Sequence, residues 1–243
     1  EIAKAIGVRS KVLRSTLYSS NYDRKRFYVE KEIPKRNGDI RIIHAVTGSL
    51  WYVQKKTHEY LSNNYKPHVC AKGFIKDGGI VKHSMIHRNK KLVISFDIKD
   101  FFPTITFARV MGMFQAPPFK FSREKSIVYA QICCLPEDNG PLPQGGITSP
   151  YISNMICRKL DSRFLKYANK EKFHYSRYAD DITFSTNENV NYGKLEKFVA
   201  KILKEEGFQI NKSKSRLMKK SDRQVVTGVV VNEGLNVNRK YIR

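Results

Sequence analysis

The chain has 243 residues, and its 45 lysines and arginines against 22 acidic residues give a formal net charge of +23. Apolar residues make up 41% of the chain, so there is enough material for a core, and the basic excess extends from end to end. A globular protein this basic usually binds a polyanion, most often nucleic acid; the alternative is a cationic surface that only keeps the protein in solution.

In chain order, the apolar spacing predicts a helix, a hairpin and a helix, followed by strands and helices in the order β, α, ββ, α, ββ. The hairpin rests on Asn37-Gly38 between two apolar runs, which is a strong turn signal. The predicted helices cover 2–18 with a break at Gly7, 50–61, 123–135, 148–168 and 192–206. The predicted strands cover 27–33, 40–44, 92–96, 175–178, 182–185, 208–210 and 225–231. This order indicates an α+β fold with an antiparallel sheet.

The cysteines and histidines do not predict a metal centre. Cys70, Cys133, Cys134 and Cys157 have neither zinc-ligand spacing nor a disulfide framework, so we expect buried free thiols in a reducing compartment. His83 and His87 are four residues apart and could share a helix face, but no third ligand follows nearby. We also find no membrane-length apolar stretch and no signal-peptide pattern, which favours a cytoplasmic protein.

Carboxylates are the most informative residues. Asp180 and Asp181 follow Tyr178-Ala179 between two predicted strands, and each should raise the pKa of the other. Asp97 ends a short apolar strand. Taken singly, the pair could be an ordinary turn and Asp97 a helix N-cap. Together they match a two-metal nucleotidyl-transfer site, because Mg²⁺ prefers carboxylate oxygen and leaves positions for substrate phosphates.

At these residues the sequence resembles reverse transcriptases. The resemblance extends over about residues 30–232, and the motifs that carry it occur in the family's order. They are Phe96–Phe102, Leu142–Pro150, Tyr178–Asp181, Asn211–Lys214 as the loop motif after the palm helix, and Val226–Gly228 as the primer-grip hairpin.

Within that family the chain looks most like the bacterial retron enzymes. Val226-Thr227-Gly228 is a signature of that branch, and helix 153–160 also resembles retron enzymes. A second signature, Asn-Ala-x-x-His, corresponds here to His83-Ser84-Met85-Ile86-His87, where only the final histidine is kept. That departure keeps a group II intron-like or other phage-defence reverse transcriptase as the alternative.

The resemblance implies a right-hand polymerase fold. Fingers are expected at 1–90, with the N-terminal helices and the β-hairpin. The palm is expected at 91–232, with 115–150 contributing to the fingers. Residues 233–243 would begin a thumb that is largely absent from this chain.

The resemblance also implies roles for single residues. Asp97, Asp180 and Asp181 would be catalytic and, with Ile98, would hold two Mg²⁺ ions, for which Mn²⁺ can substitute. The incoming nucleotide would be bound by Lys35, Arg41, Asp100, Phe101, Phe102, Gln144 and Lys214. Structured RNA would be contacted by His87, Val226, Thr227 and Gly228. Each of these roles has a structural alternative. Lys35 and Arg41 could belong to a solvated basic hairpin, Phe101 and Phe102 could be core residues, and Lys212 could take the role given to Lys214. His87 could be structural, and Val226 and Gly228 could be ordinary strand residues.

The function implied is that of a retron reverse transcriptase in the bacterial cytoplasm. Such an enzyme uses dNTPs to copy a structured noncoding RNA into branched, RNA-linked single-stranded DNA, and acts in phage defence with an effector protein. A rival from another class is an inactive polymerase fold that serves as an RNA-binding scaffold, against which the intact aspartates argue.

Overall fold

The computed structural model describes residues 1–18, 24–34 and 38–236, and the chain forms two compact units. The first unit contains residues 1–66 and 102–156, and the second contains 67–101 and 157–243. The stretch predicted as fingers, 1–90, is therefore divided at Lys66. The names fingers and palm, with their predicted boundaries, stay predictions.

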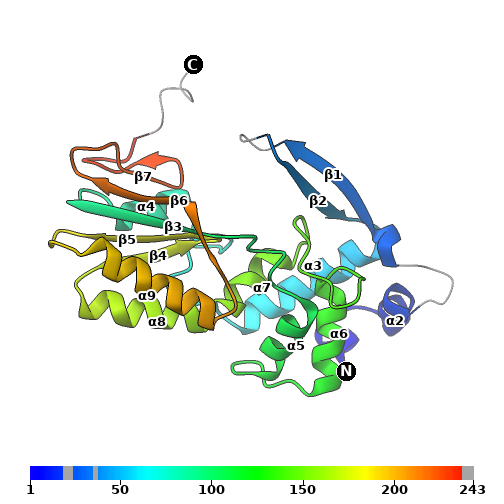
Figure 1. Ribbon diagram of the computed structural model, residues 1–243. Helices are drawn as coiled ribbons and strands as arrows, with labels where there is room; N and C mark the ends of the chain where they lie inside the picture. The colour runs from blue at the N-terminus through cyan, green and yellow to red at the C-terminus, as the bar shows by residue number, and fades with distance from the viewer. Residues whose placement is uncertain (19–23, 35–37, 237–243) are drawn as a thin grey trace. The chain divides into compact units, whose positions relative to one another are not determined.

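The first unit is mainly helical (Figure 1). Gly7 has a φ of +68° and separates the first two helices, which confirms the predicted break. The helix after residue 106 was not predicted. The elements are α1 (Ile2–Ala5), α2 (Ser10–Tyr18), the 3-10 turn η1 (Arg24–Phe27), β1 (Tyr28–Pro34), β2 (Ile40–Val46), α3 (Gly48–Asn64), α5 (Phe107–Gln115), α6 (Arg123–Cys133) and α7 (Ser149–Ile156).

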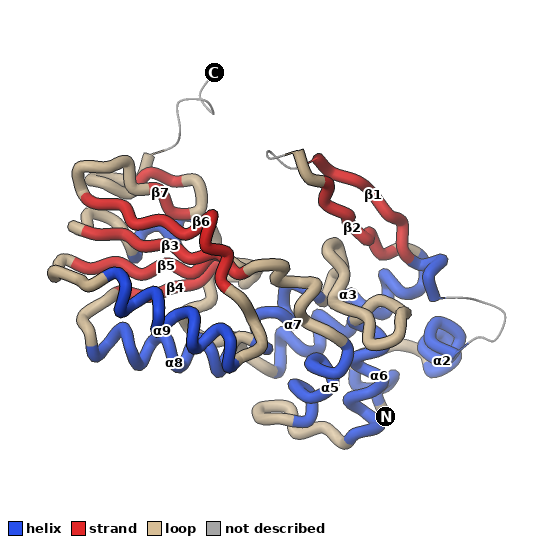
Figure 2. Tube along the Cα trace, in the orientation of Figure 1, coloured by secondary structure: helices blue, strands red, loops and turns tan. Residues whose placement is uncertain are grey.

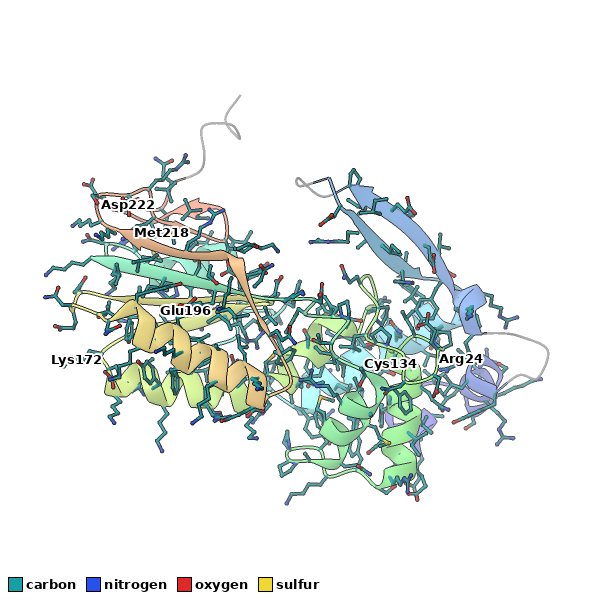
Figure 3. All side chains as sticks on the ribbon, in the orientation of Figure 1. Arg24, Cys134, Lys172, Glu196, Met218 and Asp222 are labelled. Carbon is teal, nitrogen blue, oxygen red and sulfur yellow. The ribbon has the colours of Figure 1, made fainter. Side chains whose placement is uncertain are left out.

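Aromatic packing holds α5 to α6. Phe114 is fully buried and stacks on Phe121 at 5.8 Å between ring centroids, and Tyr129 of α6 lies 5.1 Å from each of these two rings. In a different part of the unit, the Tyr28 hydroxyl donates to the Cys134 carbonyl at 3.3 Å; Figure 3 labels Cys134. The β1–β2 hairpin is antiparallel, as predicted, but most of its residues are exposed.

The second unit is built on a four-stranded antiparallel sheet in the order β4-β5-β3-β6. Helices α8 and α9 lie side by side along one face of it (Figures 1 and 2). The remaining elements are α4 and the hairpin of β7 and β8. The bounds are α4 (Ile80–Ile86), β3 (Leu92–Ile98), α8 (Arg158–Lys170), β4 (His174–Tyr178), β5 (Asp181–Thr186), α9 (Tyr192–Glu205), β6 (Ile210–Lys219), β7 (Val225–Val226) and β8 (Val229–Val230).

Strand alternation gives this sheet two chemically different faces. Tyr175 and Phe184 point toward α8, where their rings lie 5.5 and 5.7 Å from that of Phe164. Ser176 and Ser185 point the other way and contact His83 of α4 and His87, the residue that follows α4. The apolar face is the core, and the polar face carries the candidate site.

Two sequence predictions were wrong in detail. The helix expected over 148–168 is two helices, α7 and α8, separated at Cys157. The strand expected at 208–210 is the ten-residue β6, so Asn211–Lys214 lies in a strand and not in a loop. Its run of lysine, serine and arginine has no strand pattern. The two ends of β6, residues 210–211 and 216–219, are extended because they pair with the buried β3, and residues 212–215 lie in the bulge between those ends.

All four cysteines are buried and free, as predicted. Among the helices of the described part of the chain, none has the length and apolarity that crossing a membrane requires.

Candidate active site

The three aspartates meet at one end of the sheet. Asp97 is the penultimate residue of β3 and pairs directly with Asp181, the first residue of β5. Between β4 and β5 the chain turns through Ala179, whose φ is +55°, and Asp180. The Ile98 amide donates to the Asp180 carbonyl at 3.0 Å, which ties the turn to β3. Asp97 and Asp181, which are 84 positions apart in the sequence, are thereby brought together by strand pairing.

These aspartates line a cavity of about 490 Å³. It lies wholly within the second unit. Its other lining residues come from β3, β4, β6 and β7, from the turns after β4 and β7, and from the segment before α4. The lining residues are Phe74, Ser95, Phe96, Asp97, Tyr178, Ala179, Asp180, Asp181, Lys214, Arg216, Val225, Thr227 and Gly228.

The cavity concentrates negative charge. Burial, the neighbouring carboxylate of Asp180 and that of Asp97 raise the pKa of Asp181 to about 7. The Thr183 and Thr227 hydroxyls oppose that rise. Such a site is stabilised by a cation, because each carboxylate disfavours ionisation of the next.

Lys214 supplies one positive charge. Its Nζ lies 3.2 Å from Asp97 Oδ1 and donates to Oδ2 at 3.3 Å. The predicted rival Lys212 is exposed on the same strand, and it has no contact of this kind in the residues that the structure describes. The geometry thus favours Lys214 as the lysine beside the aspartates.

The donor set fits divalent metal ions. Asp97 Oδ1 is shielded from solvent and, apart from its ion pair with Lys214, accepts no well-aligned hydrogen bond in the described residues, so it could serve as a ligand. Oxygen ligands from three aspartates suit a hard cation such as Mg²⁺. Within the described residues no group of three His, Cys, Asp or Glu side chains is arranged to hold a metal ion by itself, so waters and substrate phosphates would have to supply further ligands.

The β7–β8 turn brings Thr227 to the aspartates. Thr227 has a φ of +47° and Gly228 a φ of +84°, the two positive values of a type I′ hairpin turn. A β-branched residue rarely adopts this conformation, so the turn is strained at the site. The Thr227 hydroxyl lies beside Asp181 but falls short of hydrogen-bond geometry. Val226, by contrast, is buried in a cluster with Val93, Met218 and Val231; Figure 3 labels Met218.

Two histidines of the α4 segment form a buried network on the polar face of the sheet. Ser176 Oγ lies 2.9 Å from His83 Nδ1 and 2.8 Å from His87 Nε2. His87 Nδ1 lies 2.8 Å from Ser185 Oγ, so both of its ring nitrogens have partners. Burial lowers the pKa of His83 to about 4 and holds that of His87 well below its usual range. This geometry favours the structural alternative for His87; direct RNA contact stays a prediction.

The residues after Asp97 have divergent environments. Asp100 is exposed, with a φ of +46°. Phe101 is buried and its ring lies 5.6 Å from that of Phe208, which is a core position. Phe102 is half-buried and belongs to the first unit. Of the two phenylalanines, Phe102 is therefore the better candidate for a nucleotide contact.

Other predicted nucleotide-binding residues lie in the first unit. The Gln144 carbonyl accepts from the His44 amide at 2.7 Å, which attaches this loop to β2. Gln54 of α3 holds the loop further along, because its Oε1 accepts from the Ile147 amide at 2.9 Å. Arg41 lies on β2 opposite Ile33. Lys35 is outside the described residues.

Sequence reasoning missed some of the cavity. Arg216 and Phe74 line it and were not singled out. Arg216 lies two residues after Lys214, so the period of two along a strand would have indicated it had β6 been recognised. Phe74 had no comparable sequence signal.

Comparison with known protein families identifies the family of this chain. Residues 33–231 match the family described as reverse transcriptase (RNA-dependent DNA polymerase). The chain belongs to the reverse transcriptase family. The match includes all three aspartates, Gln144 and the β7–β8 hairpin.

The resemblance to retron reverse transcriptases is also confirmed. The chain is 32% identical to the retron Mx65 reverse transcriptase of Myxococcus xanthus, over 99% of this chain and 59% of that protein. It is 32% identical to the retron Mx162 enzyme of the same organism, of which it covers 52%. The retron Ec86 enzyme of Escherichia coli is 29% identical over 96% of this chain. The chain thus spans between half and three-fifths of the first two relatives.

Solved structures confirm the polymerase fold. Telomerase from Candida albicans, in complex with a TWJ fragment of telomeric RNA, matches 95% of this chain and 48% of its own with a TM-score of 0.60 at 12% identity. Apo telomerase from Candida tropicalis matches 87% of this chain and 48% of its own with a TM-score of 0.59 at 13% identity. At these identities the likeness concerns the fold alone.

Proposed function

We propose that the protein containing this chain is a retron-type RNA-directed DNA polymerase. The observation that carries the proposal is the single cavity in which Asp97, Asp180 and Asp181 meet beside Lys214. A two-metal polymerase site requires carboxylate oxygens gathered in this way to hold the metal ions, and Lys214 adds a positively charged side chain beside them. The family match and the retron relatives support it.

In the proposed reaction Asp97, Asp180 and Asp181, with Ile98, would hold two divalent ions, Mg²⁺ or Mn²⁺. When bound, such ions supply Lewis-acid activation of the attacking hydroxyl and neutralise charge on the transferred phosphate. Lys214 would stabilise the leaving pyrophosphate, since its ammonium already lies at the Asp97 carboxylate. The other nucleotide contacts would come from Lys35, Arg41, the Asp100 backbone, Phe102 and Gln144, with Phe101 supporting them from the core.

The retron part of the proposal concerns substrate and product. The enzyme would bind a structured noncoding RNA, begin DNA at a 2′-hydroxyl of that RNA and leave a branched RNA–DNA molecule that serves phage defence with an effector protein. Thr227 and Gly228 line the catalytic cavity, so the β7–β8 turn could guide the primer end. The net charge of +23 would give the RNA affinity a steep dependence on salt.

Catalysis is tested with the full-length protein on a primed RNA template. Asp180→Asn should reduce extension by about three orders of magnitude or more while RNA binding persists, because the loss falls on transition-state charge. Asp138→Asn, an exposed aspartate of the first unit, is the matched control and should extend normally. Full extension by Asp180→Asn would remove the metal-ligand assignment.

The retron part needs a separate test. The RNA that copurifies with the full-length protein is identified and offered beside a scrambled-stem RNA of equal length. Preference for the copurified RNA, with a DNA product that stays attached to it, supports the retron reading. Equal binding of both RNAs would favour another bacterial reverse transcriptase.

A further inference from the structure

A buried ion pair lies directly behind the catalytic turn. Arg177 on β4 and Asp161 on α8 are both fully buried. Arg177 Nε donates to Asp161 Oδ1 at 2.9 Å and Nη2 donates to Oδ2 at 2.8 Å, a bidentate arrangement. Both residues belong to the second unit, and neither lines the catalytic cavity.

The same guanidinium also holds the turn. Arg177 Nη1 donates to the Ala179 carbonyl at 2.8 Å, and that carbonyl belongs to the peptide that leads into Asp180. Ala179 has a φ of +55°, an unfavourable conformation for a residue with a Cβ. One planar side chain thus connects the fixed helix α8 to the strained residue next to the catalytic aspartates.

The surroundings restrain this connection further. The Tyr175 hydroxyl donates to Asp161 Oδ1 at 2.6 Å, which orients the carboxylate. The Arg177 amide donates to the Cys70 carbonyl at 2.9 Å, and the Lys72 amide donates to the Arg177 carbonyl at 2.8 Å. Burial is the largest single influence and lowers the pKa of Arg177, but Asp161 together with Cys157 and Tyr175 outweighs it and raises that pKa, so the guanidinium stays charged.

Stability alone is a weak reason for this pair. Desolvation of two charges offsets most of their attraction, and well-packed apolar residues of the same volume are often as stable. What apolar residues could not provide is a donor to the Ala179 carbonyl. A lysine could not provide it either while keeping two bonds to Asp161, because its ammonium is a single point and not a fork.

We propose that Arg177, oriented by Asp161, is a positioning residue that holds the Ala179–Asp180 turn in the geometry needed for metal binding. The inference rests on the proposed polymerase function and deepens it. Arg177 touches no reacting atom. Its effect passes through the Ala179 carbonyl to the aspartates, so its loss should weaken metal binding and slow catalysis without altering RNA affinity.

The test uses the full-length protein with Arg177→Lys, which keeps the charge near Asp161 but loses the fork. Arg163→Lys is the matched control, because Arg163 lies on α8 two residues after Asp161 and pairs with Glu206 at 2.8 Å, but it is partly exposed and that partner lies outside the catalytic turn. Three quantities are measured: kcat for primer extension, the Mg²⁺ concentration for half-maximal rate, and the shift in Tm that Mg²⁺ causes without nucleotide.

We expect Arg177→Lys to lower kcat about 10- to 100-fold, because small displacements of reacting groups have effects of this size. The half-maximal Mg²⁺ concentration should rise several-fold and the Mg²⁺-dependent Tm shift should shrink. The control should match the wild type. A folded Arg177→Lys with normal Mg²⁺ dependence would overturn the proposal, since a merely structural role lowers only the active fraction.

If Arg177→Lys does not fold, Asp161→Asn replaces it, because an amide keeps the shape and one acceptor for Arg177. Asp161→Asn should show the raised Mg²⁺ requirement expected for Arg177→Lys. A Mg²⁺ requirement equal to that of the wild type would again overturn the proposal. If the wild type extends no primer, the polymerase function fails instead. The Mg²⁺-dependent Tm shift then still decides whether Arg177 positions the aspartates.

Discussion

Asp97 and Asp181 are direct partners across the β3–β5 pairing, so two carboxylates face each other where an antiparallel sheet would ordinarily place compatible side chains. Like charges at such positions destabilise a sheet. The arrangement indicates that the site is built for a cation and that the protein without metal bears a cost.

Asp181→Asn should therefore stabilise the metal-free protein while abolishing extension. Because the pKa of Asp181 is raised to about 7, its protonated form is favoured on folding, and that stabilisation is lost as pH rises through 7. Asparagine avoids the charge. In chelator at pH 8 the variant should be more stable by on the order of 3 kcal/mol, and at pH 4 the difference should vanish. Chemical denaturation at pH 8 and at pH 4 measures this difference in the free energy of unfolding. Equal stability at pH 8 would contradict the charge argument, and Mg²⁺ should stabilise the wild type more than the variant.

The buried histidines predict a loss of stability in acid. The pKa of His83 is lowered to about 4, so between about pH 6.5 and pH 4 the unfolded chain binds a proton that the folded chain does not. Stability should fall across that window as pH decreases, by roughly 3 kcal/mol for this group. His83→Gln retains polar contacts and should show a shallower slope. His68→Gln is the comparison: His68 is only partly buried and burial lowers its pKa as well, so this variant should change the slope less than His83→Gln does. Identical slopes for wild type and His83→Gln would exclude His83 as the source.

Gly145 is required by the loop that carries Gln144. Its φ is +114°, and a Cβ there would lie 2.9 Å from the His44 carbonyl oxygen, a backbone atom that cannot move aside. Gly145→Ala should destabilise the protein by about 1–3 kcal/mol and raise the KM for dNTP. Gly112→Ala is the control: it lies within α5 with open space around its Cβ, so it should stabilise by about 0.5–1 kcal/mol. A neutral Gly145→Ala would mean that the loop adapts.

Phe102 should select the sugar. It is half-buried, whereas Phe101 is in the core, so Phe102 has a surface to present to a nucleotide. Phe102→Ala should increase the ratio of ribonucleotide to deoxynucleotide incorporation by opening space beneath the 2′ position. Single-nucleotide extension with each substrate measures the ratio. An unchanged ratio would place the steric gate at another residue.

Much of the site was predictable because its signals are local. The short apolar run before Asp97 and the strand–turn–strand pattern around Asp180 each depend on a few neighbouring residues. The α+β fold class followed from the order of such patterns. Most of β6 lay beyond the strand expected at 208–210, and α5 was not anticipated at all. β6 has a polar sequence and is extended only because β3 offers an edge with which to pair.

From the sequence alone came the three aspartates, the hairpins and the family to which they belong. Only the tertiary structure decided that Lys214 contacts Asp97, that His87 is buried between Ser176 and Ser185, and that Arg177 bonds both Asp161 and the catalytic turn. The physical reason is that side-chain alternation and turn chemistry act over a few residues. Which lysine meets which aspartate depends on strand register, here altered by a bulge opposite Ser95–Asp97, and register is set by pairing between distant segments.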